Sequence, residues 1–373
     1  MNWDDTVYDV IVSSQNYFKE HNLKSGGVKM AKGKVDLVIG GQYGSEGKGG
    51  IALWWAIKNN IRCSVRIGGA NAGHTAYYEG KKWVFKQLPV CSILPEACSV
   101  VAAGSYLDLE ILKKEMDAVG VSPYNLIIDP KAVMIEDGDE KSLDKGNLIS
   151  EIGSTASGTG WAVMKRIMRG GAGEVRFAKD IPELEPYLQD SVSFMRSVME
   201  NGEDILLEGT QGYGLSCIHS DCWPFVTSRD TNAGGFLSEA GLSPFDVRDI
   251  LMIIRTYPIR VGGNSGPMKD ELDWNIVANE SGYASKGVDI TELTTVTKRI
   301  RRVGRFDADM VMRAIDLNQP TKIILGFLDY IDHNCFYDDQ ITDKATEWVL
   351  DCERKIGRKV DYVGWNGKEY HPF

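Results

Sequence analysis

A short apolar strand followed by a glycine-rich turn and a helix constrains the fold of this chain more than any other feature. Residues Val35–Gly40 read Val-Asp-Leu-Val-Ile-Gly, an apolar run of strand length that ends in glycine. The turn at residues 41–47 is rich in glycine, and residues 49–60 have helical spacing. The helix residues expected to face inward are Ile51, Leu53, Trp54 and Ile57. This order of elements opens a nucleotide-binding α/β unit.

Strand-like apolar runs recur along the chain and alternate with helical stretches. Further strands are expected at residues 63–67, 99–103, 126–128, 205–207, 250–254 and 322–325, and helices at residues 108–119 and 188–201. The alternation predicts an α/β fold with a large, mainly parallel central sheet flanked by helices. Residues 30–373 are expected to form a single domain. Residues 1–29 are expected to be an extension that is helical or flexible.

Composition disfavours several classes of function. The formal net charge of −10 over 373 residues argues against binding to nucleic acid or to a membrane surface, which needs clustered basic residues. No apolar run approaches the roughly 18 residues of a membrane span. Seven scattered cysteines predict reduced thiols in a cytoplasm. The group Cys217, His219, Asp221 and Cys222 matches no common zinc spacing and is interpreted as loop and core residues.

The first glycine-rich loop, residues 44–49, reads Gly-Ser-Glu-Gly-Lys-Gly. Glycine lets backbone N–H groups approach phosphate oxygens, a helix N-terminus attracts anions, and Lys48 adds a positive charge. The loop departs from the Walker A pattern, because five residues separate Gly41 from Gly47 and Gly49 replaces the magnesium-binding hydroxyl. Taken alone, it fits either a phosphate-binding loop or a structural turn.

The second glycine-rich loop, residues 68–75, reads Gly-Gly-Ala-Asn-Ala-Gly-His-Thr. It follows a predicted strand and therefore lies at the carboxyl edge of the sheet, where open α/β proteins bind ligands. A histidine is more often a satisfied core or surface group. In a loop of small residues, however, His74 has little packing around it, which favours a functional role.

The two loops together resemble the adenylosuccinate synthetase family, whose usual forms are Gly-Asp-Glu-Gly-Lys-Gly and Asn-Ala-Gly-His-Thr. Further segments agree in order, at residues 152–155, 208–212, 224–228, 233–235, 260–262, 294–305 and 328–329. The resemblance implies a P-loop-NTPase-like fold and a carbon–nitrogen ligase. In that family the γ-phosphate of a nucleoside triphosphate moves to O6 of a purine monophosphate, and the L-aspartate amine then displaces it at C6.

The resemblance assigns roles by position. The catalytic residues are Ser45, Lys48, His74 and Gln211. The residues for the donor nucleotide are Gly44, Glu46, Gly47, Lys48, Gly49, Gly73, Thr75, Arg301 and Asp329. Those for the purine monophosphate are Ser45, Asn71, Ser154, Thr155, Arg169, Gln211, Thr227 and Val261. The aspartate-binding residues are Thr295, Val296, Thr297 and Arg299, and the Mg²⁺ ligands are Ser45 and Gly73.

Two of these assignments carry wider implications. An arginine at the position of Arg169 reaches the neighbouring subunit's monophosphate site in the family, which implies a homodimer; an ordinary solvated charge is the alternative. The loop that contains Arg299 and Arg301 is interpreted as an aspartate-binding loop, because a guanidinium suits a carboxylate. A nucleic-acid patch or a solvated basic face is the alternative for that loop, and the acidic chain disfavours the former.

The chain departs from the family at Ser45. The family has an aspartate there, which takes the N1 proton of the base and helps to bind Mg²⁺. A serine is no base near pH 7, so the chain has either lost activity or changed its substrate. A guanine base carries a 2-amino group beside N1, which a carboxylate would crowd and a hydroxyl would not. Phage-type members, the 2-aminoadenylosuccinate synthetases, share this serine, resemble residues 228–230, 258–263 and 292–298, and are similarly short.

The sequence therefore predicts a ligase that joins L-aspartate to dGMP and yields 2-amino-2′-deoxy-N6-succinyladenylate, in a host cytoplasm if the chain is viral. Water or the substrate itself would take the N1 proton. Asp329 favours GTP as the donor, whereas the phage-type resemblance favours ATP or dATP, which is the expectation. The alternatives are an ordinary synthetase acting on IMP, a nucleotide-binding regulator without turnover, and a generic P-loop ATPase.

Overall fold

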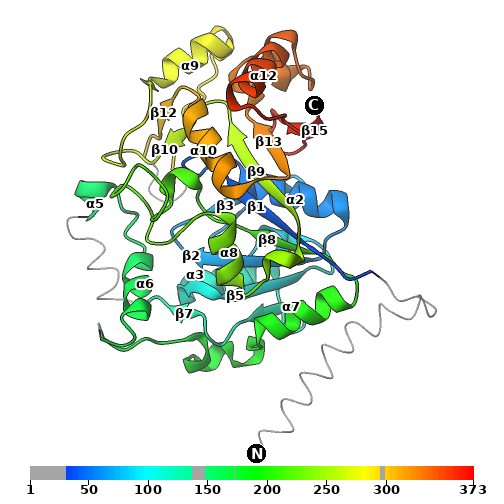
Figure 1. Ribbon diagram of the computed structural model, residues 1–373, viewed down its shortest axis with the longest axis vertical. Coiled ribbons are helices and arrows are strands. Elements are labelled where there is room, and N and C mark those ends of the chain that lie inside the picture. The colour runs from blue at the N-terminus through cyan, green and yellow to red at the C-terminus, as the bar shows by residue number, and fades with distance from the viewer. Residues whose placement is uncertain (1–30, 137–147, 172, 295–298) are drawn as a thin grey trace, which may run out of the picture.

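Figure 1 shows the computed structural model of the chain, which describes residues 31–136, 148–171, 173–294 and 299–373. The predicted extension, residues 1–29, lies outside the described residues. A ten-stranded sheet crosses the molecule. In spatial order its strands are β15 (His371–Pro372), β14 (Tyr362–Val363), β13 (Lys322–Gly326), β9 (Val247–Arg255), β1 (Val35–Gly40), β8 (Ile205–Glu208), β2 (Cys63–Gly69), β5 (Cys98–Leu107) and β6 (Leu126–Ile128), and β7 (Val133–Met134) also pairs with β5.

The neighbouring strands of this sheet are parallel, apart from the antiparallel pair β14 and β15. The large, mainly parallel sheet predicted from the sequence is thereby confirmed. Parallel strands place their carboxyl ends at one edge, so the segments that follow β1, β2, β8, β9 and β13 converge there.

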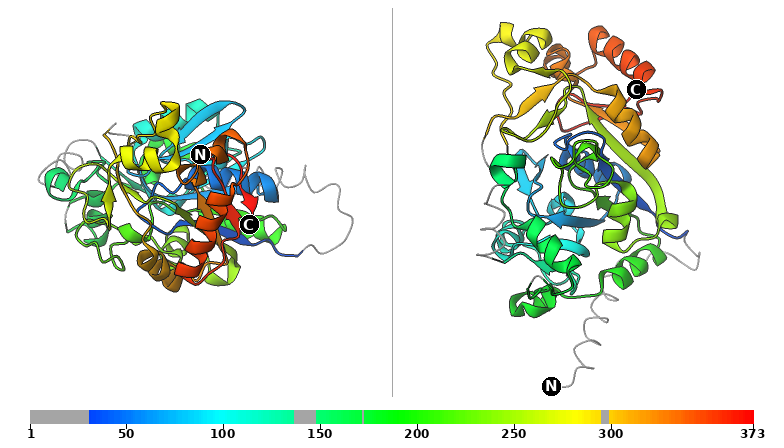
Figure 2. Two further views of the ribbon diagram at one scale, coloured as in Figure 1. Left: turned by 90° about the horizontal axis from the view of Figure 1, so that it is seen from above. Right: turned by 60° about the vertical axis from the view of Figure 1, so that its left-hand side comes forward.

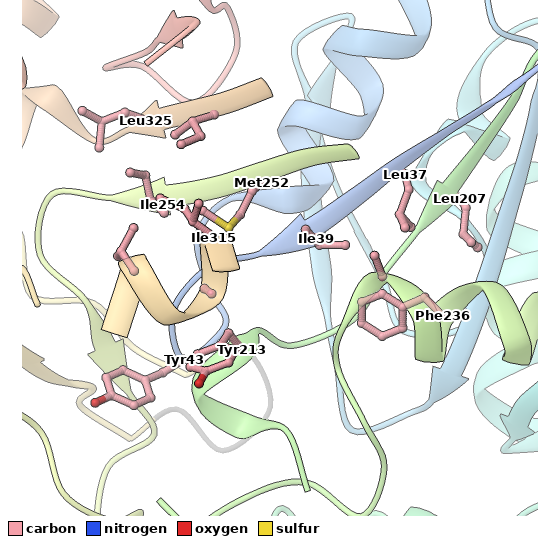
Figure 3. Packing of buried hydrophobic residues seen from close by; sticks show 14 of the residues in the cluster. Leu37, Ile39, Tyr43, Leu207, Tyr213, Phe236, Met252, Ile254, Ile315 and Leu325 are labelled. Carbon is pink, nitrogen blue, oxygen red and sulfur yellow. The ribbon is translucent and has the colours of Figure 1, made fainter. Parts of the chain in front are cut away.

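Helices cover both faces of the sheet. They are α2 (Lys48–Asn59), α3 (Leu109–Val119), α5 (Leu148–Ile152), α6 (Thr159–Ile167), α7 (Ser191–Glu200), α8 (Ala233–Ala240), α9 (Trp274–Ser281), α10 (Ala308–Asn318), α11 (Asn334–Tyr337) and α12 (Asp343–Ile356). Leu37 and Ile39 of β1 pack in one core with Phe236 of α8 and Ile315 of α10 (Figure 3). Val38, on the opposite face of β1, packs against α2.

Two small antiparallel sheets flank the large one (Figure 2). The hairpin of β3 (His74–Tyr78) and β4 (Lys81–Phe85) follows β2 directly. The other small sheet has the order β10 (Ile259–Arg260), β12 (Arg302–Gly304) and β11 (Glu271–Leu272). In this sheet the chain that follows β9 pairs with the segment after residue 298, which places Arg260 opposite Arg302.

The structure corrects two details of the predicted elements. The glycines at 68 and 69 belong to β2, and His74 begins β3, so His74 is buried rather than held in an open loop. In α2, Ile57 is 54% exposed, whereas Trp55 is buried together with Ala52 and Ala56. The physical reason is that the small alanines let α2 approach the sheet closely, which turns the buried stripe away from Ile57.

No helix among the described residues is both long enough and apolar enough to cross a membrane. Each of the seven cysteines, all of them at described positions, has a free thiol.

The carboxylate of Asp36, in the central strand β1, is buried in this packing. Asp36 is fully buried and accepts hydrogen bonds from Trp55 Nε1 at 2.7 Å and from Arg248 Nη2 at 2.7 Å. We expect Asp36→Ala to lower the free energy of unfolding by about 3 kcal/mol, because it leaves a buried indole N–H without its acceptor and removes a carboxylate that binds Arg248. Chemical denaturation measures this loss.

Asp204→Ala is the matched control, since Asp204 binds the same guanidinium from a more exposed position, at 2.6 Å. It should cost less than about 1 kcal/mol. Equal losses in the two variants would contradict the assigned role of Asp36.

Candidate functional site

A cavity of about 600 Å³ opens at the carboxyl edge of the large sheet. The predicted site residues that line it are Gly44, Ser45, Gly47, Lys48, Gly49, Asn71, Gly73, His74, Thr75, Ser154, Thr155, Gln211, Thr227, Val261 and Arg301. They come from segments far apart in the chain, and the parallel sheet brings them to one place. Three non-glycine residues of the lining, Ser45, Gln211 and Phe327, have positive φ angles of 60°, 59° and 65°. Such backbone conformations gather at functional sites.

Glu46 stabilises the loop before α2 through hydrogen bonds with its backbone. Its carboxylate is fully buried and accepts from the N–H groups of Gln42 at 3.1 Å and Gly44 at 2.7 Å. Lys48 Nζ lies 2.6 Å from the same carboxylate. The Glu46 side chain does not line the cavity, whereas Lys48 does. Glu46 therefore holds Lys48 at the wall that a triphosphate would approach.

Ser45 is surrounded by two arginines. Arg301 Nη1 donates to Ser45 Oγ at 2.7 Å, and Arg255 Nη1 donates to the Ser45 carbonyl at 2.9 Å. Burial lowers the pKa of Arg301, but a guanidinium keeps its proton at neutral pH. The hydroxyl at the position of the family's carboxylate is therefore bound by a cation from the segment that follows residue 298.

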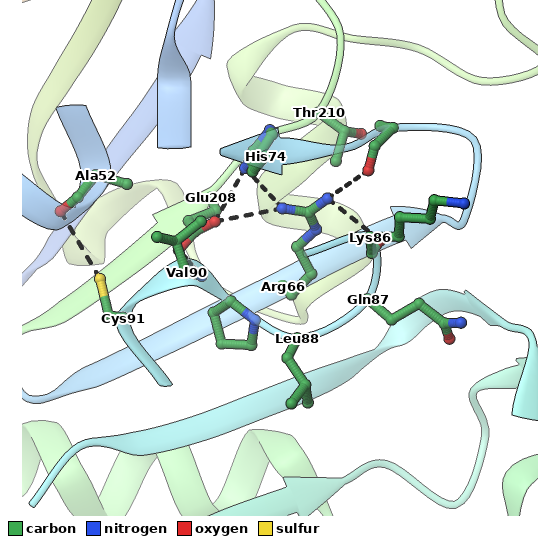
Figure 4. Close-up of polar contacts among 12 residues, drawn as sticks. Ala52, Arg66, His74, Lys86, Gln87, Leu88, Val90, Cys91, Glu208 and Thr210 are labelled. Atoms are coloured by element: carbon green, nitrogen blue, oxygen red, sulfur yellow. Dashed lines mark hydrogen bonds and ion pairs between the residues drawn. The ribbon is translucent and has the colours of Figure 1, made fainter. Parts of the chain in front are cut away.

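His74 lies in a buried ionic cluster with Arg66 and Glu208 (Figure 4). Its Nδ1 is 2.6 Å from Arg66 Nη1 and 3.0 Å from Glu208 Oε2, whereas its Nε2 has no partner. Burial, together with the charges of Arg66 and Lys48, holds the pKa of His74 well below its ordinary value. Burial also raises the pKa of Glu208 to about 7. His74 is therefore neutral where it meets the cavity.

Neutral polar groups gather at another part of the wall. Thr227 Oγ1 accepts from Gln211 Nε2 at 3.1 Å and from Asn71 Nδ2 at 3.5 Å, and Ser154 and Thr155 line the same cavity. Hydroxyl and amide groups are common ligands of phosphate oxygens. This part of the wall suits a monophosphate.

Phe327 and Asp329 follow β13 and have different surroundings. The ring of Phe327 lines the cavity, and the Arg255 guanidinium lies 3.9 Å from its centroid. Asp329 is buried, does not line the cavity and accepts a hydrogen bond from Tyr283 Oη at 3.1 Å. Burial raises the pKa of its carboxyl to about 7. The acceptor expected to contact a donor base is thus turned into the protein.

The remaining predicted residues lie away from the cavity or outside the described residues. Arg169 is exposed just after α6, and Arg299 is exposed, with its N–H donating to Thr294 Oγ1 at 3.0 Å. Thr295, Val296 and Thr297 lie outside the described residues. Within the described part of the chain, no group of three or more His, Cys, Asp and Glu side chains is arranged to hold a metal.

The predicted Mg²⁺ ligands are a hydroxyl, Ser45 Oγ, and a carbonyl, that of Gly73, and both residues line the cavity. Hard oxygen donors suit Mg²⁺, which binds through few protein groups when phosphates supply the rest. The donor set therefore fits the ion in the presence of a triphosphate.

Three charged residues that shape the site received no role from the sequence: Arg66, Arg255 and Glu292. Arg255 is fully buried and donates to Glu292, which lines the cavity. The sequence held a signal for both arginines, because Arg66 interrupts the apolar run of one predicted strand, residues 63–67, and Arg255 directly follows that of another, residues 250–254. Such a residue is buried only when it has partners.

Comparison with known proteins matches this chain to the family model described as adenylosuccinate synthetase over residues 37–176 and 174–335. The chain belongs to the adenylosuccinate synthetase family. A synthetase of Methanococcus aeolicus is 36% identical over 346 residues, which cover 90% of this chain and 97% of that protein. A synthetase of Pyrococcus sp. strain ST700 is 34% identical and covers 88% of this chain and 94% of its own length.

Two solved structures of family members are similar to this one. The succinoaminodeoxyadenylate synthetase PurZ of cyanophage S-2L, bound to dGMP and to dATP as an energy donor, has a TM-score of 0.76 and 27% identity, and covers 91% of this chain and 95% of its own. Adenylosuccinate synthetase from Plasmodium falciparum has a TM-score of 0.77 over 91% of this chain and 100% of its own, and its 22% identity supports the fold alone.

The comparisons correct one part of the sequence argument. The archaeal synthetases align with this chain over 94% to 97% of their own length, so shortness does not separate phage-type members from ordinary ones. The choice between the branches depends on the site residues.

Buried Asp329 predicts a measurable pH dependence of stability. Its carboxyl has a pKa of about 7 in the folded chain, whereas an unfolded aspartate ionises near pH 4. Between these values the folded chain binds more protons, so the free energy of unfolding falls as pH rises. We therefore expect the stability of Asp329→Asn, measured relative to that of the unmodified chain, to increase by on the order of 2 kcal/mol as the pH rises from 5 to 8.

Denaturation curves at both pH values measure this difference. Tyr283→Phe serves as a control, because it removes the hydrogen bond and leaves the buried carboxyl in place. A stability difference between Asp329→Asn and the unmodified chain that does not change with pH would contradict the raised pKa.

Proposed function

We propose that the chain is a 2-aminoadenylosuccinate synthetase, which condenses L-aspartate with C6 of dGMP through a 6-phosphoryl intermediate. The observation that carries the proposal is the hydroxyl of Ser45, bound by Arg301 at 2.7 Å, at the position of the family's catalytic carboxylate. A hydroxyl leaves room for the 2-amino group beside N1 of guanine. A carboxylate at the same position would bring its oxygens against that group.

The charges around Ser45 support chemistry without that carboxylate. Phosphorylation at O6 requires the base to lose its N1 proton and to develop negative charge on O6. The cations of Lys48 and Arg301 line the cavity and favour such an anion. The proton passes to water or to the substrate itself.

The residues that line the cavity bind different parts of the substrates. Lys48 attracts the donor phosphates, and His74 meets the transferring phosphoryl group. Asn71, Thr155 and Thr227 hold the monophosphate. Ser45 and Gly73 would hold Mg²⁺, which would supply neutralisation of the phosphate charge. Arg299 belongs to the segment that binds the carboxylates of aspartate.

ATP or dATP is the proposed donor. Asp329, the acceptor that would select guanine, is buried against Tyr283 away from the cavity, whereas the aromatic ring of Phe327 lines it. A ring face accepts any purine by stacking. The phage enzyme of similar structure is described as bound to dGMP and to dATP as an energy donor.

A homodimer is part of the proposal. Arg169 does not line the cavity of its own chain, and three exposed apolar side chains, Met164, Ile167 and Met168, lie near it in the sequence, on α6 and just after it. Exposed apolar side chains beside a functional residue favour a subunit contact. Arg169 would then reach the monophosphate site of the second subunit.

An ordinary adenylosuccinate synthetase acting on IMP is the second candidate. The archaeal relatives at 34% to 36% identity favour it. It would require a base other than residue 45.

The test offers the full chain Mg²⁺ and L-aspartate with dGMP or IMP, each with ATP, dATP or GTP, and identifies products by mass. We expect an aspartate adduct of dGMP, formed faster with ATP or dATP than with GTP. An adduct of IMP alone would return the chain to ordinary purine synthesis. Nucleotide binding without any adduct would favour a regulator.

A serine near the expected sugar position supports a deoxyribose. Ser265 is buried, and its Oγ donates to the Val261 carbonyl at 2.5 Å. Arg302 Nη1 donates to the same hydroxyl at 3.2 Å, and because a guanidinium only donates, the hydroxyl proton is left for the carbonyl. The Val261 carbonyl is therefore satisfied without a hydroxyl from the substrate.

The segment that contains Val261 and Ser265 lies near two groups of cavity residues, those around Ser45 and those expected to bind the monophosphate. Arg260 lies over the ring of Tyr43 at 4.4 Å, next to the loop that contains Ser45. A Cβ atom on Gly153 would meet Ser265 at 3.2 Å, next to the monophosphate residues. A sugar that joins base and phosphate lies along this segment.

We expect Ser265→Ala to lower the ratio of kcat/KM for dGMP to that for GMP roughly fivefold. With dGMP the backbone carbonyl of Val261 loses the hydrogen bond from Ser265 without a replacement, whereas the 2′-hydroxyl of GMP replaces it, a difference of about 1 kcal/mol. An equal loss for both nucleotides would mean that Ser265 only supports the fold.

A further inference from the structure

Arg66 is a buried arginine in the middle of β2, outside the cavity lining, and it faces the histidine that does line the cavity. Its side chain is 2% exposed, and its Nη1 lies 2.6 Å from His74 Nδ1 (Figure 4). None of the roles assigned above uses this contact.

The guanidinium of Arg66 is held in one orientation. Its Nη2 donates to the Ala72 carbonyl at 2.8 Å and to the Lys86 carbonyl at 3.2 Å. These carbonyls belong to the chain before β3 and after β4, so both ends of the hairpin fix the arginine. Nη1 therefore cannot turn away from His74 without the loss of two buried hydrogen bonds.

A guanidinium has five N–H donors and no acceptor. At 2.6 Å, an N–H of Arg66 requires a lone pair on the facing nitrogen, so His74 Nδ1 is unprotonated. A ring without a proton on Nδ1 cannot be an imidazolium, so this contact also makes His74 neutral. Its single proton is then on Nε2, the nitrogen that is buried without a protein partner.

Glu208 would favour the opposite tautomer of His74, in which Nδ1 carries the proton and donates a hydrogen bond to the Glu208 carboxylate. Its Oε2 is 3.0 Å from Nδ1 and 3.3 Å from Arg66 Nη1, and its Oε1 accepts from the Val90 N–H at 2.7 Å. That arrangement would place an Nδ1–H against an Arg66 N–H at 2.6 Å, which is repulsive. The shorter contact therefore decides in favour of Arg66.

We propose that Arg66 is a positioning residue that fixes the tautomer of His74, so that Nε2 of this cavity-lining histidine carries the proton and serves as a neutral hydrogen-bond donor. In phosphoryl transfer the charge spreads over the oxygens of the transferred group, and a preorganised donor stabilises it. The expected effect of Arg66 on activity rests on the proposed phosphoryl transfer. The tautomer of His74 does not depend on which purine is the substrate.

The first test is the ¹⁵N NMR spectrum of the full chain with ¹⁵N-labelled histidine, without substrate. The chain has five histidines, so a His74→Gln variant assigns the signals of His74. We expect a pyridine-like Nδ1 and a pyrrole-like Nε2. The reverse pattern, or a ring protonated on both nitrogens, would overturn the proposal.

The second test is Arg66→Lys, which keeps the charge but cannot reach three acceptors at once. We expect mixed tautomers of His74 and a kcat about 10- to 100-fold lower, with KM changed less than about threefold. Arg229→Lys is the matched control, because Arg229 is also a buried arginine and packs against Gly68 of the same strand. It should lower stability and leave the His74 tautomer unchanged.

Activity is measured with whichever purine monophosphate the unmodified chain converts, so a wrong substrate assignment does not affect this test. An Arg66→Lys chain that folds, keeps the Nε2–H tautomer and loses activity would also overturn the proposal, because Arg66 would then act by another route. If Arg66→Lys does not fold, the spectrum of the unmodified chain decides alone.

Discussion

The burial of Arg255 at the carboxyl end of β9 is the constraint on which the site depends. The side chain is fully buried and donates to the Ser45 carbonyl at 2.9 Å and to the carboxylate of Glu292. Its guanidinium also covers the ring of Phe327 at 3.9 Å. A buried charge is costly unless its donors are paired, so this arginine ties together the phosphate loop, the segment before residue 295 and the chain after β13.

This arrangement explains why a serine can occupy the position of the family's carboxylate. The cavity wall next to Ser45 already contains Lys48 and Arg301, and a neutral hydroxyl leaves their charge for phosphate groups and for an anionic base. The deoxyribose preference would arise at a separate place, where Ser265 satisfies the Val261 carbonyl. Base and sugar selection would thus depend on different residues, and each can be altered without the other.

Much of the fold followed from local patterns, because buried parallel strands are continuous apolar runs and each predicted strand is present. The inward face of α2 did not follow, since the contribution of Ala52 and Ala56 to close packing is absent from a count of large apolar residues. The motifs placed fifteen predicted residues in one cavity. The sequence did not show the contacts of Arg66 with Glu208 and of Arg255 with Ser45, because more than one hundred residues separate each pair and only the sheet order brings them together. The inward turn of Asp329 likewise depends on Tyr283, a residue of a distant segment.

Equilibrium binding tests most directly whether the hydroxyl of Ser45 makes room for the 2-amino group of guanine. Calorimetric titration would compare dGMP with dIMP, which differ only in that group, on the unmodified chain and on Ser45→Asp. We expect Ser45→Asp to lose tenfold or more in affinity for dGMP, about 1.4 kcal/mol, while its affinity for dIMP changes little. Equal changes for the two nucleotides, or a preference of the unmodified chain for dIMP, would contradict this role of Ser45.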